Sequence, residues 1–281
     1  MTAANEANQD QVKAWNETSG RAWVEMQRPL ERMLAPFATL LIEKGLSDST
    51  RRVLDVGCGW GATTFAAARR IGPGGSCVGV DVSTPLLELA QARAREEHVT
   101  NVSFVRADAQ THAFEPNDFD AVISRFGVMF FDDPIAAFAN IKRAARPGAA
   151  LTFVAWRSPA ENPFMTAAAR AAAPILSLPA PDPNAPGQFA LADAGRVREI
   201  LQRSGWKHVE LRPIDIPCTV AQSDLLEYVT KLGPVGAALR DVTDPELRAR
   251  TVSAVRGAFT PFIHDGEARF DAACWLTSAR A

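Results

Sequence analysis

The stretch VLDVGCGWG, from Val53 to Gly61, constrains the fold of this chain more than any other part of the sequence. An apolar run leads into three glycines at alternate positions, and an Ala-rich stretch follows them. Glycine lacks a Cβ, so it allows the backbone to turn sharply and a ligand to lie against the main chain. The pattern predicts a strand over Arg52–Val56, a turn at Gly57, Gly59 and Gly61, and a helix through Arg70.

The alternation of strand-like and helix-like stretches continues to residue 156. Short runs rich in β-branched residues are separated by longer Ala-rich stretches. Strands that alternate with helices indicate an α/β fold, with a doubly wound, mostly parallel sheet and helices on both faces. Further strands are predicted over Ser76–Val80, Val102–Arg106, Asp120–Ser124 and Leu151–Trp156, and helices over Thr84–His98 and Pro134–Arg146.

The flanking regions break this rhythm and divide the chain into three parts. The pattern of residues 1–50 predicts an N-terminal helical segment, with helices over Val12–Met26 and Leu30–Lys44, that covers a ligand site of the core. The core itself is predicted over residues 51–156. Residues 157–281 supply the rest of the sheet (Ala192–Ser204 as a helix, Trp206–Val220 and Phe270–Ser278 as strands) with a substrate cap from insertions at 157–190 and 223–262. The Pro- and Ala-rich first insertion has a linker's composition, but its apolar side chains favour short helices. These side chains are Phe164, Met165, Ile175 and Leu176.

Composition restricts the partners. The 281 residues carry a formal net charge of −2, which argues against nucleic acid. No apolar run approaches the ~20 residues of a membrane span, and the N-terminus is too polar for a signal peptide, so we expect a soluble, cytoplasmic protein with no membrane partner. Either a monomer or a homodimer fits. No metal is expected, because the cysteines lack metal-ligand spacing and predict buried thiols: Cys58, Cys77, Cys218 and Cys274.

The glycine spacing and two acids point to a nucleoside-bearing cofactor. Dinucleotide-binding enzymes use G-x-G-x-x-G, whereas the third glycine here comes one residue earlier. Asp81 ends the second strand, where its two acceptor oxygens suit a ribose diol. The alternative is that Asp81 caps the next helix, although Ser83 stands where a cap is more typical. Asp108 follows the third strand.

These motifs, in this order, resemble those of the class I S-adenosylmethionine-dependent methyltransferases, whose first motif reads (V/L)LDxGxGxG. FDAVIS (119–124) matches the family's fDxV strand, and RPGA (146–149) matches its LkPGG turn with Ala149 in place of a glycine. The resemblance covers residues 12–156. It implies a Rossmann-like seven-stranded sheet, S-adenosylmethionine as cofactor and S-adenosylhomocysteine as product. It also implies that Asp108 binds the adenine amino group.

The cofactor site implied by the resemblance comprises Trp15, Trp23, Asp55, Gly57, Cys58, Gly59, Gly61, Asp81, Val82, Asp108, Ala109, Ser124, Arg125 and Phe126. Within it, the spacing A-W-N-x6-W from Ala14 to Trp23 is similar to the YWN…W entrance of the ubiquinone/menaquinone-biosynthesis C-methyltransferase-like group (methyltransferase domain 11/25 type), with Trp15 replacing Tyr. A tryptophan face attracts a sulfonium by cation–π interaction. Equally, Trp15 and Trp23 could fix the N-terminal helices to the core.

A sulfonium is an activated methyl donor, so the protein must mainly align the reactants and exclude water. A general base is needed only if the acceptor must lose a proton, and no catalytic residue is assigned. The four histidines, His98, His112, His208 and His264, fall at positions typical of the surface, and Tyr228 in the second insertion is a weak candidate.

The acceptor is predicted to be a small apolar or aromatic molecule, from side chains at the carboxyl end of the sheet and in the first insertion. These side chains are Phe126, Met129, Phe130, Trp156 and Phe164, and core packing is their alternative role. Arg125 fits a carboxylate or enolate, or a surface ion pair. Neither a (D/N/S)-P-P-(Y/F) tetrad nor a Pro-Cys pair occurs, which argues against methylation of bases. The competing functions are a non-catalytic S-adenosylmethionine-binding protein and a nicotinamide-dependent oxidoreductase.

Overall fold

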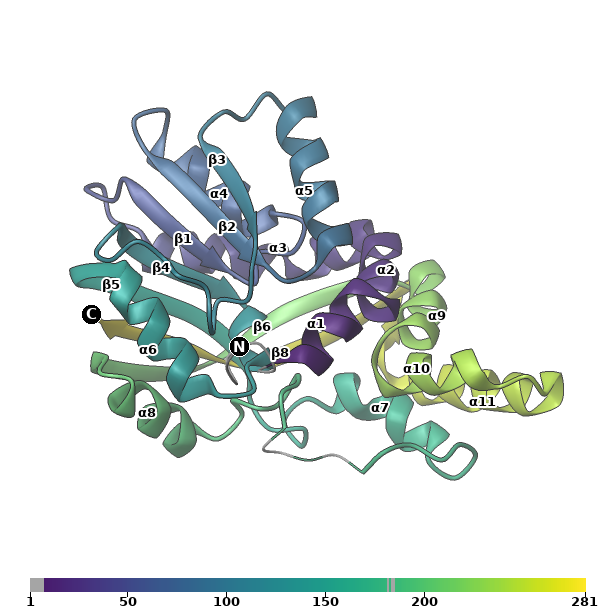
Figure 1. The fold of residues 1–281 in the computed structure, drawn as a ribbon. Coiled ribbons are helices and arrows are strands. Elements are labelled where there is room, and N and C mark those ends of the chain that lie inside the picture. Colours follow the sequence, from purple (N-terminus) through teal and green to yellow (C-terminus); the bar gives the residue numbers. More distant parts are fainter. Residues whose placement is uncertain (1–7, 181, 183–184) are drawn as a thin grey trace.

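The strand that precedes the glycines lies inside a single mixed sheet (Figure 1). The computed structural model describes residues 8–180, 182 and 185–281; residues 1–7 of the predicted N-terminal segment and residues 181, 183 and 184 of the first predicted insertion lie outside this description. The strands are β1 (Arg52–Val56), β2 (Ser76–Asp81), β3 (Val102–Arg106), β4 (Phe119–Arg125), β5 (Ala145–Trp156), β6 (Lys207–Ala221), β7 (Ile263–His264) and β8 (Glu267–Arg280).

The sheet order is β3-β2-β1-β4-β5-β8-β6, in which β8 runs antiparallel to both of its neighbours. The strand order reverses between β1 and β4, so the carboxyl ends of these two parallel strands flank a crevice suited to a ligand. The prediction of seven strands is wrong by one: β7 pairs with β8 in a short hairpin. Its turn, Asp265–Gly266, has φ angles of 51° and 81°, and Asp-Gly is a strong signal for such a turn.

Helices cover both faces of the sheet. They are α3 (Gln27–Gly45), α4 (Ala62–Ile71), α5 (Thr84–Glu96), α6 (Pro134–Ala144) and α8 (Ala194–Arg203). In Figure 1, α6 and α8 lie in front of the sheet and α3 and α4 behind it. The predicted helix over Pro134–Arg146 ends earlier than expected, because β5 starts at Ala145 and the residue before Pro147 disfavours the helical region.

The predicted helix over Val12–Met26 is also wrong as a single element. It is broken at Glu17, where φ is −101° and ψ is −104°, into α1 (Gln9–Asn16) and α2 (Thr18–Glu25). We call residues 9–25 the strap. Asn16, just before the break, bonds to the Val82 carbonyl (2.9 Å) and the Thr84 N–H (2.9 Å). These contacts join the strap to the loop after β2.

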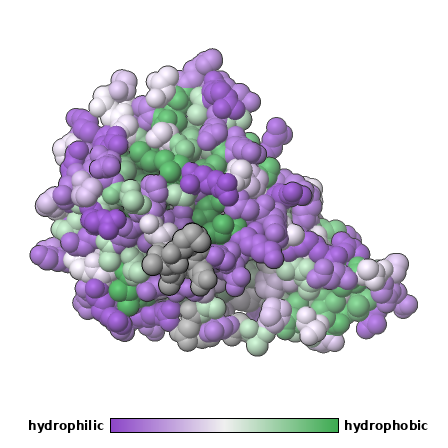
Figure 2. Space-filling model, viewed as in Figure 1, coloured by the Kyte–Doolittle hydropathy of each residue, from purple (hydrophilic) through white to green (hydrophobic). Residues whose placement is uncertain are grey.

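Beyond the carboxyl end of the sheet, four helices form what we call the cap: α7 (Pro163–Ala172), α9 (Gln222–Lys231), α10 (Gly233–Asp241) and α11 (Pro245–Ala258). Both predicted insertions therefore contribute helices to it. Buried Phe164 and Val229 of the cap belong to the same apolar core as Leu54 of β1 and Phe153 of β5. Figure 2 shows a mostly hydrophilic face, with hydrophobic residues gathered on the cap at the lower right.

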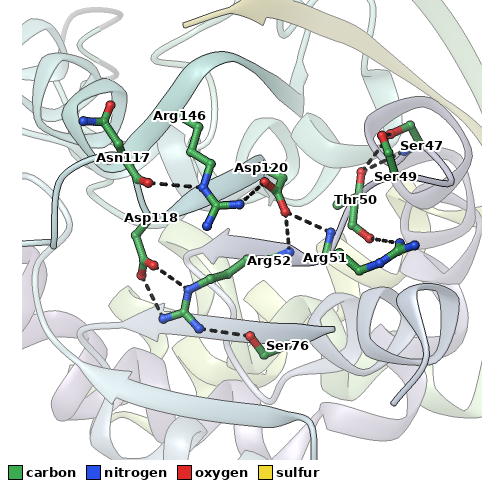
Figure 3. Close-up of polar contacts among 10 residues, drawn as sticks. All are labelled: Ser47, Ser49, Thr50, Arg51, Arg52, Ser76, Asn117, Asp118, Asp120 and Arg146. Atoms are coloured by element: carbon green, nitrogen blue, oxygen red, sulfur yellow. Dashed lines mark hydrogen bonds and ion pairs between the residues drawn. The ribbon is translucent and has the colours of Figure 1, made fainter. Parts of the chain in front are cut away.

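The amino ends of the strands are fastened by charged side chains (Figure 3). Asp120 accepts hydrogen bonds from the backbone N–H groups of Arg51 (2.9 Å) and Arg52 (2.8 Å) and pairs with Arg146. The Arg52 guanidinium holds both carboxylate oxygens of Asp118, at 2.7 and 2.8 Å. This network fixes β1 beside β4 at the end of the sheet opposite the crevice.

Candidate active site

The glycine loop after β1 is held between β2 and the residues after β4. The N–H groups of Gly57 and Cys58 both donate to the Val80 carbonyl, at 2.8 and 3.1 Å. The loop glycines have φ angles of 68°, 53° and 80°, a region that L side chains rarely adopt. A Cβ on Gly57 would lie 2.6 Å from the Gly127 Cα, so only glycine fits there.

A cavity of about 1030 Å³ opens beside this loop, bounded by the strap, the carboxyl ends of the strands and the cap. Most of the predicted cofactor residues line it: Trp15, Trp23, Gly57, Cys58, Gly59, Asp81, Val82, Asp108, Ala109, Arg125 and Phe126. The remaining predicted substrate residues line the same cavity: Met129, Phe130, Trp156 and Phe164. The structure thus brings both predicted sets together.

Three predicted cofactor residues, Asp55, Gly61 and Ser124, lie outside the cavity lining. Asp55 is buried beneath the loop, where it accepts a hydrogen bond from the Thr64 hydroxyl at 2.7 Å, and burial raises its pKa to about 7. The Ser124 hydroxyl donates to the Val56 carbonyl at 2.7 Å. A Cβ on Gly61 would meet the Phe104 ring at 2.9 Å. These residues therefore shape the loop from behind.

Asp81 fastens the end of β2 to the loop. Its carboxylate accepts hydrogen bonds from the backbone N–H groups of Gly59 and Ser83, both at 2.8 Å. The expectation that the Ser83 side chain caps the next helix is wrong, because its hydroxyl donates to the Trp15 carbonyl at 2.8 Å. Burial raises the pKa of Asp81, against the effect of these hydrogen bonds. A carboxylate has about four acceptor sites, so these hydrogen bonds leave room for a donor from a ligand.

Asp108 offers an acceptor atom without a protein donor. Its Oδ1 accepts from the Gln110 N–H at 2.9 Å, whereas its Oδ2 is buried and has no partner among the described residues. A buried polar atom without a partner costs free energy, and a ligand amino group would satisfy it. The unpartnered oxygen and the side-chain-free surface at Gly57 both fit an adenosine-bearing cofactor.

Aromatic rings continue the cavity wall from the loop through the strap. Trp60 lies 5.8 Å from Trp23, Trp23 lies 5.5 Å from Trp15, and Trp15 lies 5.3 Å from Phe130, measured between ring centroids. Trp60 was not among the predicted site residues, although it stands within the glycine motif itself. The strap tryptophans pack on the core, and they also line the cavity, where their contact with a sulfonium stays a prediction.

The cap side of the cavity is aromatic. The rings of Phe126 and Trp156 stack at 4.6 Å, and Phe164 stacks on Phe270 at 3.8 Å. The Tyr228 hydroxyl contacts only the Met165 sulfur, at 3.7 Å, among the described residues, and burial raises its pKa. Tyr228, a weak candidate from sequence, is therefore a protonated donor in this wall.

None of the four histidines lines the cavity in the described part of the chain. Within the same residues, no group of three or more His, Cys, Asp or Glu side chains could hold a metal ion, and no helix is long and apolar enough to cross a membrane. All four cysteines are buried and free, as expected. The cavity thus has two acids, Asp81 and Asp108, beside the ends of β2 and β3, aromatic rings on its cap side and, in the described part of the chain, no histidine.

Comparison with known proteins decides the family. Residues 53–148 match the model of a methyltransferase domain. This segment is a class I S-adenosylmethionine-dependent methyltransferase domain. It contains the glycine loop, Asp81 and Asp108, whereas the strap and the cap lie outside the match.

The relatives of this methyltransferase domain are similar over part of their length. An uncharacterized protein of Mycobacterium tuberculosis is 32% identical over 56% of this chain and 56% of its own. Aklanonic acid methyltransferase DauC of Streptomyces sp. is 31% identical over 49% of this chain and 60% of its own. The chain thus spans little more than half the length of these curated relatives. YcgJ of Bacillus subtilis has the same fold, with a TM-score of 0.60 and 18% identity over 88% of this chain and 98% of its own.

Proposed function

We propose that this protein transfers the methyl group of S-adenosylmethionine to a small apolar or aromatic acceptor by in-line displacement. The observation that carries the proposal is the single cavity shared by the cofactor motif and an aromatic wall. Ligand sites are typically apolar concavities with a few placed polar groups, and this cavity has that character.

In this proposal, Asp81 receives the ribose hydroxyls and Asp108 Oδ2 receives the adenine amino group. The bound cofactor supplies an activated methyl group, and the residues of the chain align the acceptor with it and exclude water. The strap closes the cofactor side through Trp15 and Trp23, while Phe126, Trp156 and Phe164 face the acceptor. Tyr228 stays protonated at neutral pH and can donate a hydrogen bond to an acceptor oxygen.

The names of the curated relatives agree with an acceptor of this kind. They include an aklanonic acid methyltransferase, a nocamycin O-methyltransferase (40% identical over 95 residues) and demethylmenaquinone methyltransferases. Each name describes that relative. The apolar side chains of the cap that line the cavity support an apolar acceptor for this protein as well. The cap lies outside the matched domain, so this support comes from the chain's own residues.

Two other functions make different predictions. A non-catalytic S-adenosylmethionine-binding protein would keep Asp81 and Asp108 but show no turnover. A nicotinamide-dependent oxidoreductase would need a pyrophosphate site, and the G-x-G-x-G spacing disfavours it.

The testing experiment follows a radiolabelled methyl group from S-adenosylmethionine into acceptor products separated by chromatography. Phenols, naphthols and hydroxyquinones serve as acceptors, and phosphoethanolamine serves as the polar comparison. We expect label in the products of apolar acceptors only, with the Tyr228→Phe variant raising KM more than it lowers kcat. Transfer to phosphoethanolamine alone would contradict the proposed acceptor, and S-adenosylhomocysteine binding without any transfer would favour the non-catalytic alternative.

A further inference from the structure

On its cap side, the cavity has a buried aromatic end at the start of α7. Phe164, in the first turn of this helix, is 1% exposed. Its ring centroid lies 6.2 Å from that of Tyr228 and 5.0 Å from that of Phe259, and all three side chains line the cavity. From this point α7 leads away from the sheet (Figure 1). The helix therefore connects the aromatic end of the cavity with the outer part of the cap.

The cavity continues along one face of α7. Met165, Ala169 and Ala173 are spaced four residues apart, so they lie on one face of the helix, and all three line the cavity. Met165 and Ala169 are half-buried, whereas Ala173, which still has helical backbone angles, is exposed. The distance along the helix from Met165 to Ala173 is about 12 Å. The cavity therefore extends over this length from its buried end toward the solvent.

Small side chains keep this part of the cavity open. The Tyr228 hydroxyl contacts the Met165 sulfur at 3.7 Å, which sets α9 beside α7 at that point. One turn further along α7, the side chain of Ala169 is a single methyl group, and half-buried Ala168 beside it also lines the cavity. Protein interiors are normally filled to high density, so a space bordered by alanines at half-buried positions is available to a ligand. We call the space along Met165, Ala168, Ala169 and Ala173 the slot.

The lining of the slot suits an apolar group. Its walls are methyl groups and a thioether, and burial of apolar surface against them is favourable in proportion to its area. Arg170, the charged residue of α7, also borders the cavity, but it is exposed and bonds to the Pro163 carbonyl at 3.1 Å. The whole cavity, of about 1030 Å³, is as large as the largest typical ligand sites, at roughly 1,000 Å³. It therefore has room for an acceptor longer than one ring beside the cofactor.

We infer that the slot receives an extended apolar body of the methyl acceptor and that Ala169 determines the length of acceptor that fits. This inference rests on the proposed function. The methylated ring lies near Phe126 and Trp156 in this arrangement, and the rest of the acceptor follows α7 toward the solvent. Further fused rings and an alkyl chain are two sources of the same apolar chemistry. Ala169 is thus a specificity-determining residue rather than a catalytic one.

Calorimetric titration of acceptors into the S-adenosylhomocysteine-saturated protein tests the slot. Phenol and 2-naphthol are the short probes, and 4-hexylphenol and 2-hydroxyanthracene extend them by a chain and by a ring. The wild type should bind at least one extended probe roughly tenfold more tightly than its short counterpart. Ala169→Phe, which fills the slot, should reduce this ratio to about twofold or less. Ala171→Phe is the matched control, because Ala171 is also half-buried on α7 but lies outside the cavity lining, and it should keep the ratio.

A cooperative urea unfolding transition shows that each variant is folded. A preference for 4-hexylphenol assigns the slot to a chain and a preference for 2-hydroxyanthracene assigns it to fused rings, and either result supports the inference. Equal wild-type affinities within both pairs, an unchanged ratio in Ala169→Phe, or an equal fall in Ala171→Phe would overturn the slot. Methyl transfer to 2-naphthol in the same wild-type sample would then leave the proposed function standing. A folded wild type that does not bind S-adenosylhomocysteine would instead overturn the proposed function itself.

Discussion

Gly57 and Gly127 approach so closely that a Cβ on Gly57 would lie 2.6 Å from the Gly127 Cα, and one on Gly127 would lie 2.7 Å from the Gly57 Cα. This contact joins the loop after β1 to the residues after β4. It fixes the glycine loop relative to Phe126 and Met129, which line the same cavity.

Gly57→Ala should therefore damage both stability and binding. Alanine at a positive φ costs about 1–2 kcal/mol, and the backbone clash adds roughly 1–3 kcal/mol. Gly148→Ala is the matched control, because Gly148 has a φ of 79° but nothing within 4 Å of its Cβ position. Urea unfolding should show a smaller loss for the control, which should also keep its S-adenosylhomocysteine affinity. Similar losses in both variants would show that the contact is unimportant.

Asn16→Ala should loosen the strap over the cofactor. It removes the hydrogen bonds to Val82 and Thr84, so we expect S-adenosylhomocysteine to dissociate faster, with affinity roughly tenfold weaker. Stopped-flow displacement measures this rate. Asn101→Ala is the control, since Asn101 bonds to the Ala68 and Gly72 carbonyls, away from the cavity lining. An unchanged rate in Asn16→Ala would mean that the strap does not gate release.

Asp55 should make stability depend on pH. Burial raises its pKa from 3.8 to about 7, although the Thr64 hydroxyl and Arg125 oppose this. The folded chain holds the Asp55 proton more tightly than the unfolded chain does. The contribution of this proton to the free energy of unfolding is therefore complete below about pH 4 and is lost as the pH rises to 7. Relative to wild type, Asp55→Asn should gain roughly 3–4 kcal/mol of unfolding free energy between these limits.

Asp120→Asn should change the pH dependence of the unfolding free energy in the opposite direction to Asp55→Asn. Burial raises the pKa of Asp120, but hydrogen bonds from the Arg51 and Arg52 N–H groups and from Arg146 outweigh it and hold the pKa below 3.8. Its stabilising effect is present at neutral pH and is lost on acidification. Unfolding curves that shift in the same direction for both variants would contradict the assignment of these pKa shifts.

Phe164→Ala should show that the cap contributes to acceptor binding and not to cofactor binding. The side chain is 1% exposed and stacks on Phe270, so its loss should cost about 3–5 kcal/mol of unfolding free energy. Affinity for S-adenosylhomocysteine should stay unchanged in the folded variant, while acceptor KM rises. Tyr228→Phe, which removes a single hydroxyl, is the mild control and should cost under about 1 kcal/mol. Loss of cofactor affinity in Phe164→Ala would argue against the division of the cavity.

Much of the core and its site follows from local sequence, because the carboxyl ends of neighbouring parallel strands meet at one edge of a sheet. This rule places Gly57, Asp81, Asp108 and Arg125 around one crevice, as observed. The same rule does not determine which residues of a loop face the cavity and which face the protein core. Gly61 accordingly turns its Cβ position toward Phe104 rather than into the cavity.

The remaining differences arise from contacts between distant residues. The break at Glu17 follows the bonds of Asn16 to a loop 66 and 68 positions away, which helical periodicity does not report. Tyr228 enters the cavity wall because α9 packs on the long β6 and β8 strands. The β7 hairpin is different, since Asp265–Gly266 signals it locally.

The most direct test of the account is a calorimetric titration of the wild type with S-adenosylhomocysteine and, separately, with NAD. We predict binding of the first and not the second, weakened roughly tenfold or more in Asp81→Asn and unchanged in Asp120→Asn at the opposite end of the sheet. A folded wild type that binds NAD instead, or that binds neither, would contradict the central claim.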